Sequence, residues 1–123
     1  MSLHHFRIVV RGVFDGLDET ARVRLRAALG DHDIFDSAFT EAGTLTYDGH
    51  LHAFNTRFGL RAEGERDQAR AEVERLALER TVDLLAGLDV AGRDLRVTIT
   101  DMADMWGSEQ RRDRLREARR SAS

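Results

Sequence analysis

The 123-residue sequence predicts an α+β fold, a ferredoxin-like βαββαβ sandwich in which two helices cover one face of an antiparallel sheet. Two observations predict it. Several segments alternate apolar and polar residues with a period of two, which is typical of half-buried strands. Two further stretches place apolar residues at helical spacing, so that the order along the chain is strand, helix, hairpin, helix, strand.

The first half of the chain supplies a strand, a helix and part of a hairpin. We expect the first strand over residues 5–13, with its most apolar side chains on one side. A helix follows between Asp18, a good N-cap residue, and Gly30, which favours a helix end. Residues 34–40 and 44–47 both have strand-like patterns and are separated by a turn or bulge.

The second half completes the sheet. The dipeptide at 48–49, Asp-Gly, predicts a tight hairpin with a primed turn that leads into a long strand over residues 50–62. The longest helix is expected over residues 65–86, and a last strand over residues 95–100. That helix carries an apolar stripe formed by Ala69, Val73, Leu76 and Leu84, which Leu88 continues just beyond its end.

Composition indicates one cytoplasmic domain at residues 1–106 and a charged, arginine-rich tail at 107–123, helical or disordered. The absence of cysteine excludes disulfides, thiolate metal sites and cysteine nucleophiles. No apolar run is long enough to span a membrane, and no signal-peptide core follows the N-terminus. All 19 basic residues are arginine, but the net charge of −3 argues against a nucleic-acid partner.

The chain resembles an uncharacterised family of small proteins from high-GC bacteria, catalogued as a domain of unknown function. The likeness runs from Phe6 to Trp106 and is carried by RGVFDGL at 11–17, FTEAGTLTYD at 39–48 and TDMADMW at 100–106. The resemblance implies a shared fold and no assigned activity.

A weaker resemblance is to the acylphosphatases, whose first loop is similar to Val13-Phe14-Asp15-Gly16-Leu17. Acylphosphatases grip phosphate with this loop, which requires bare backbone N–H groups and positive charge. Here Asp15, Asp18 and Glu19 repel an anion, so phosphatase activity is not expected.

The sheet face opposite the helices is the main candidate site. Strand alternation places there Arg7, Val9, Arg11, Asn55, Arg57, Arg61, Arg96, Thr98 and Thr100. The first and third strands are adjacent in a ferredoxin-like sheet, so several guanidinium groups would lie close together and require a compensating charge. That charge belongs either to a small anionic ligand or to acidic groups of the tail or a second subunit. RNA is a less favoured partner, because RRM-type sheets stack bases on exposed aromatic residues and this face shows none at the strand positions that stacking requires.

Two functions follow from this arrangement. The first is a homodimeric binding or regulatory module, with the dimer formed through the open sheet face, in which Arg7, Asn55, Arg57, Arg96 and Trp106 bind a small anion. The alternative is a cofactor-free enzyme resembling the dimeric α/β-barrel monooxygenases or cyclases, a comparison based on fold alone. Its candidate acid and base groups are His32, Tyr47 and Asp104.

Two smaller clusters have both a structural and a functional interpretation. His50 and His52 would lie on one side of a strand, as in some zinc or copper sites, but a third ligand is missing and we expect no metal or other cofactor. Asp101 and Asp104 beside Trp106 form either an acid–base pair or, with Asp101 as an N-cap, the start of a short packed helix.

Overall fold

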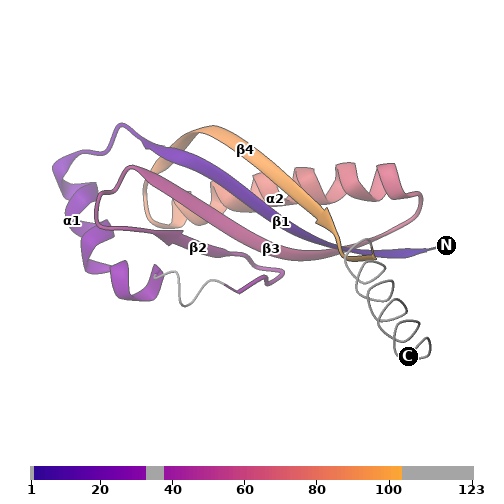
Figure 1. Cartoon of the computed structure of the whole chain (residues 1–123). Helices are drawn as coiled ribbons and strands as arrows, with labels where there is room; N and C mark the ends of the chain where they lie inside the picture. The colour runs from indigo at the N-terminus through magenta and orange to yellow at the C-terminus, as the bar shows by residue number, and fades with distance from the viewer. Residues whose placement is uncertain (1, 33–37, 104–123) are drawn as a thin grey trace, which may run out of the picture.

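The computed structural model describes residues 2–32 and 38–103. These residues form four strands, two α-helices and one 3-10 helix (Figure 1). In chain order the elements are β1 (Leu3–Asp15), α1 (Glu19–Ala27), η1 (Leu29–His32), β2 (Thr44–Tyr47), β3 (Ala53–Glu63), α2 (Arg66–Gly87) and β4 (Ala91–Asp101). Apart from the strand expected at 34–40, each expected strand and helix is present, and β1 and β4 are longer at both ends than their patterns suggested.

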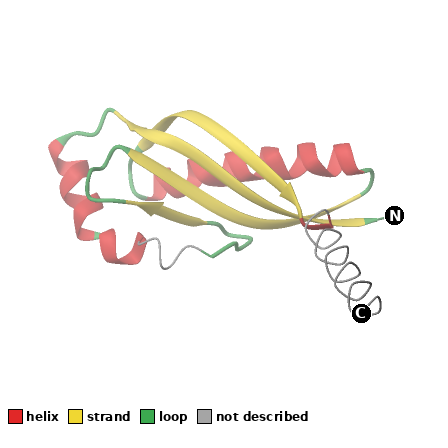
Figure 2. Ribbon diagram, viewed as in Figure 1, coloured by secondary structure: helices red, strands yellow, loops and turns green. Residues whose placement is uncertain are grey.

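The four strands form one antiparallel sheet in the order β2-β3-β1-β4, which confirms the α+β class and the central position of the first and third strands (Figure 2). β1 and β3 pair without interruption from Leu3 opposite Glu63 to Val13 opposite Ala53. β4 pairs with the other edge of β1, with a register shift between Arg11 and Val13. This register determines which side chains share each row across the sheet.

α2 covers one face of the sheet and packs against β1, β3 and β4. Its buried residues recur every fourth position, as expected for one face of a helix, and are Ala69, Val73, Ala77, Thr81 and Leu85. They pack on the inward side chains of the strands, among them Phe6, Ile8, Val10, Phe58 and Leu60. The predicted stripe was incomplete: Leu76 and Leu84 pack at the margin of this row and are partly buried, and the small residues that complete the row were missed.

α1 covers only one end of the sheet face on which α2 lies, with Leu25 packed beside Phe14, Phe54 and Leu85, so the structure differs from the predicted sandwich in how far this helix extends over the face. The helix is nine residues long and lies across one end of the sheet, whereas α2 runs along the face (Figure 1). Only Ala21 and Leu25 of α1 are buried, because a helix this short presents little apolar surface. Asp18 caps it as predicted, its Oδ1 accepting a hydrogen bond from the Ala21 N–H at 2.8 Å. The chain leaves the α-helix at Ala27 and continues in η1, which contains Gly30.

The β2–β3 connection is longer than the predicted two-residue turn. Leu51 has a left-handed backbone with φ of 55° and is buried, so it turns the chain into the core before β3 begins at Ala53. His50 and His52 therefore lie in a loop, and the expected strand geometry for a metal-binding pair was wrong. Within residues 2–32 and 38–103 no three histidine, cysteine or acidic side chains gather as a metal site would require.

Several predictions concern residues outside the described part of the chain. These are most of the strand expected at 34–40, the side chains of Asp104 and Trp106, and the tail at 107–123. Among the described residues, Thr40 forms a bridge to Phe58 at the edge of the sheet. No helix in the described ranges is long and apolar enough to cross a membrane.

Candidate functional site

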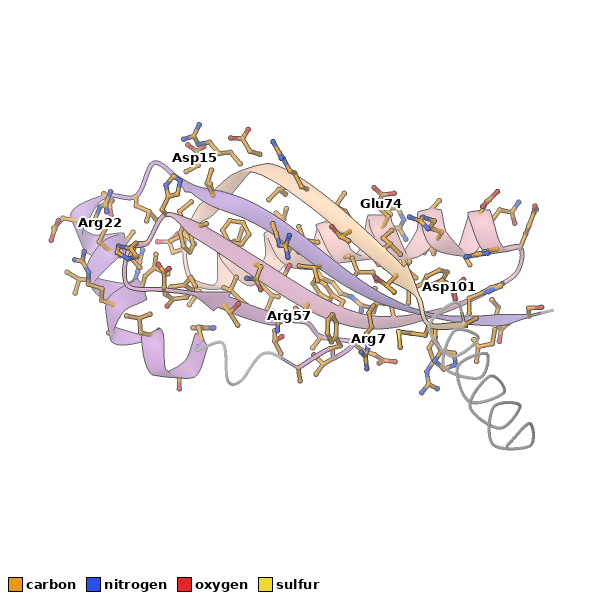
Figure 3. The ribbon with its side chains drawn as sticks, viewed as in Figure 1. Arg7, Asp15, Arg22, Arg57, Glu74 and Asp101 are labelled. Atoms are coloured by element: carbon orange, nitrogen blue, oxygen red, sulfur yellow. The ribbon has the colours of Figure 1, made fainter. Side chains whose placement is uncertain are left out.

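The face of the sheet opposite α2, called the open face below, gathers most of the predicted ligand-binding residues. Arg11 lies between Asn55 on β3 and Arg96 on β4 in one row across the sheet. The next rows place Val9 between Arg57 and Thr98, and Arg7 between Gly59 and Thr100. Figure 3 shows Arg7 and Arg57 near one another on the side of the sheet away from α2. Arg7, Asn55, Arg57 and Arg96 thus share one surface.

Arg11 and Arg96 place two positive charges directly opposite one another on this surface. They are direct cross-strand partners, both are exposed, and like charges in this position are destabilising. Among the described residues, no carboxylate forms an ion pair with either of them. The nearby Arg93, by contrast, has carboxylate partners in Asp15 and Asp94 at 3.8 and 3.9 Å.

A cavity of about 670 Å³ opens beside Arg11, at the end of the sheet near η1. Thr46 and Asn55 also line it, and the Thr46 hydroxyl donates to Asn55 Oδ1 at 2.8 Å. Because the Asn55 oxygen is already an acceptor in this bond, its NH₂ group is left to donate elsewhere. Asp48 lies on the rim, its carboxylate accepting from the His50 N–H at 3.0 Å. The cavity therefore combines the Arg11 guanidinium and the Asn55 NH₂ group with one acidic residue and a lining that is otherwise mostly apolar or glycine.

The structure also brings together two of the three predicted catalytic residues. The rings of His32 and Tyr47 lie 5.3 Å apart between centroids. Both are tied to the backbone: His32 Nδ1 lies 3.0 Å from the Leu45 carbonyl, and the Tyr47 hydroxyl donates to the Leu25 carbonyl at 2.6 Å.

Burial, reinforced by the negative charge of Asp31, raises the pKa of the Tyr47 hydroxyl above its usual value of 10.0. A phenol is protonated at neutral pH in any case, and the raised pKa extends the protonated form to higher pH than in a free tyrosine. These contacts show how Tyr47 and His32 join α1 and η1 to β2, whereas their role as acid and base stays a prediction.

Asp101 has the structural surroundings that the N-cap interpretation predicts. Its side chain is 4% exposed, forms an ion pair with Arg66 at 3.0 Å and accepts from the Ala103 N–H at 2.9 Å. Figure 3 shows it at the end of β4 beside the start of α2. The ion pair and the cap account for a buried carboxylate at this position.

One aromatic residue on the open face was missed by the sequence reasoning. Phe39 was assigned to the strand-like segment at 34–40, but it lies outside the strands, is 37% exposed and lies against the open face. The guanidinium carbons of Arg7 and Arg57 lie 5.0 and 5.8 Å from its ring centroid. Phe39 therefore adds an aromatic ring to this face from outside the strand positions that the sequence prediction covered. The only sequence signal was the neighbouring Glu41-Ala42-Gly43, which marks a turn that moves Phe39 out of line with β2.

The fold and site define a small α+β protein with one helix-covered and one arginine-rich sheet face. Residues 1–114 match the model of a family of unknown function, DUF6204, and the chain belongs to that family. No curated protein matches the chain. No solved structure matches it either. The family supplies no activity, so the function has to be argued from the site.

Proposed function

We propose that this protein is a binding or regulatory module that holds a small anionic ligand on its open face. The observation that carries the proposal is the direct opposition of Arg11 and Arg96, two exposed arginines without an ion-pair partner among the described residues. An anion between the two strands removes their mutual repulsion and accepts hydrogen bonds from both planar guanidinium groups.

The adjoining cavity supports a ligand of metabolite size. Its volume of about 670 Å³ lies within the range of roughly 300–1,000 Å³ that is typical of small-molecule sites. Arg11 reaches this cavity from β1 and Asn55 from β3, so charge and neutral donors converge on one wall. Arg7 and Arg57 extend the positive surface along the same face.

A thermal-shift experiment with inorganic phosphate, succinate and citrate tests the proposal, with ionic strength held constant by sodium chloride. At least one anion is expected to raise the unfolding midpoint of the wild type above that in chloride alone. Arg11→Gln and Arg96→Gln should lose this response, whereas Arg70→Gln, an exposed site on α2, should keep it. No response in the wild type, or equal responses in all variants, would overturn the proposal.

We further propose that a second copy of the chain covers the open face, with the ligand between the two copies. The strand order β2-β3-β1-β4, with α2 along one face and α1 at one end of that face, supports a variant of the ferredoxin-like fold whose other face is left for a partner. Two facing arginine-rich surfaces repel unless anions lie between them, so phosphate should strengthen the dimer. Sedimentation velocity with and without phosphate tests this, and a monomer under both conditions contradicts it.

The approach of His32 to Tyr47 favours one alternative, a cofactor-free enzyme resembling the dimeric α/β-barrel monooxygenases or cyclases. That candidate requires the Tyr47 hydroxyl to exchange its bond to the Leu25 carbonyl for one to a substrate. It predicts oxygen uptake with a quinol and no added cofactor, lost in Tyr47→Phe. No uptake above the protein-free blank contradicts it.

A further inference from the structure

The segment that carries Phe39 is held in place by several hydrogen bonds. The Thr44 hydroxyl donates to the Ala38 carbonyl at 2.6 Å, and the Gly43 N–H donates to the Thr40 hydroxyl oxygen at 3.0 Å. The Gly59 N–H on β3 donates to the Thr40 carbonyl at 3.0 Å, which joins the segment to the sheet edge. Local and long-range bonds therefore fix the position from which Phe39 projects.

Two glycines make this arrangement sterically feasible. A Cβ on Gly59 would lie 3.1 Å from the Phe39 carbonyl oxygen, so only glycine lets the segment lie this close to β3 without a shift. Gly43 has a left-handed φ of 87°, and a Cβ there would clash with the ring of Phe58. This close fit explains the glycine at position 43 in the stretch FTEAGTLTYD.

The result is an anchored aromatic ring that stays partly in solvent. The other exposed large hydrophobic residues of the described chain are aliphatic: Leu3, Val23 and Val82. Phe39 differs because it lies on a charged surface, with the Arg7 guanidinium 5.0 Å from its ring centroid. A cation–π contact occupies the face of a guanidinium, and its N–H donors remain available for an oxyanion.

A hollow of about 270 Å³ adjoins the ring and is lined by Phe39, Arg7 and Arg61 together with Gly59. This volume is just below the roughly 300–1,000 Å³ typical of drug-sized ligands, which favours a single ring with one charged group. Arg7 and Arg61 supply positive charge, and Phe39 supplies a π surface at the same place.

We propose that this Phe39 site selects anions in which a planar aromatic ring carries a carboxylate or phosphate. The inference rests on the proposed function of the open face and narrows its ligand class. The ring stacks on Phe39 or on the Arg7 guanidinium, and the oxyanion accepts hydrogen bonds from Arg7 and Arg61. An aliphatic anion of the same charge and similar size gains only the second of these contributions.

Isothermal titration with benzoate and cyclohexanecarboxylate separates the two contributions, because both are six-membered-ring carboxylates and only one ring is aromatic. The wild type should bind benzoate about 3- to 10-fold more tightly. A parallel comparison of adenosine monophosphate with ribose 5-phosphate shows whether the aromatic preference extends to phosphate ligands. A preference for benzoate indicates that the site takes aromatic carboxylates, and a preference for adenosine monophosphate indicates that it takes phosphates that carry an aromatic ring.

Phe39→Leu should abolish the aromatic preference, and Phe39→Tyr should keep it. Val82→Ala, another exposed apolar site on α2, serves as the control and should behave as the wild type. Equal binding within both ligand pairs, or a preference that persists in Phe39→Leu, overturns this inference and leaves the anion site standing. If none of the four probes binds, and phosphate, succinate and citrate also fail, the proposed function itself falls.

Discussion

Replacing Arg96 by glutamine should stabilise the unliganded protein while weakening anion binding. Arg96 and Arg11 are direct cross-strand partners, and the Cβ atoms of such partners lie about 5 Å apart. Two unit charges about 7 Å apart in water repel by about 0.6 kcal/mol, within the range of roughly 0.2–1 kcal/mol for cross-strand pairs. For a 123-residue chain this corresponds to a rise of about 2 °C in the unfolding midpoint.

Calorimetry of wild type, Arg96→Gln and Arg96→Lys at low and high salt measures this effect. Arg96→Lys keeps the charge and should show no gain in stability. The gain of Arg96→Gln should disappear near 1 M salt, where the Debye length falls to about 3 Å. If Arg96→Gln is less stable than the wild type at low salt, or its gain is independent of salt, then the two arginines do not repel as argued.

Three further predictions concern the framework of the site. Tyr47→Phe should lower the free energy of unfolding by about 1 kcal/mol at neutral pH through a lost hydrogen bond. The raised pKa of Tyr47 means that its contribution is complete below pH 10.0 and is lost as pH rises through the raised pKa. Denaturant unfolding against pH should show this loss in the wild type and not in Tyr47→Phe, since no lysine or cysteine titrates there. Thr81→Val should cost about 1–3 kcal/mol by leaving the buried Thr56 hydroxyl without its acceptor, and the double variant with Thr56→Val should recover most of it in urea unfolding. Gly43→Ala should lower the free energy of unfolding by about 1–3 kcal/mol, because position 43 has a positive φ and a Cβ there would clash with the Phe58 ring. Gly87→Ala, where a Cβ meets no other atom, should be neutral or stabilising. Equal effects of the two substitutions would contradict the steric explanation.

Much of the fold could be predicted because side-chain period is a local property. Alternation along β1 and β3 depends only on strand geometry, and it correctly separated the inward from the outward side chains. Which residues of α2 are buried was harder to predict from the sequence. Small residues such as Ala77 and Thr81 face the sheet, and larger leucines lie at the margin of the contact. The position of α1 could not be predicted, because it depends on how Leu25 packs against distant parts of the chain.

The residues of the candidate site likewise include some that could be predicted from local sequence patterns and some that could not. Alternation and strand order together place Arg7, Arg57 and Arg96 on one face, and the register then makes Arg96 the partner of Arg11. Phe39 could not be placed there from its own pattern, because its position depends on hydrogen bonds from other parts of the chain. The assignment of His50 and His52 to a strand failed because the left-handed turn at Leu51 delays β3.

Mapping amide chemical shifts during a titration with benzoate and then phosphate measures anion binding at the open face itself. The perturbed amides should gather on β1, β3 and β4 around Arg7, Arg11 and Arg96, and those near Phe39 should respond most strongly to benzoate. Perturbations confined to α2 or to α1, or none at millimolar anion, would contradict anion binding at this face.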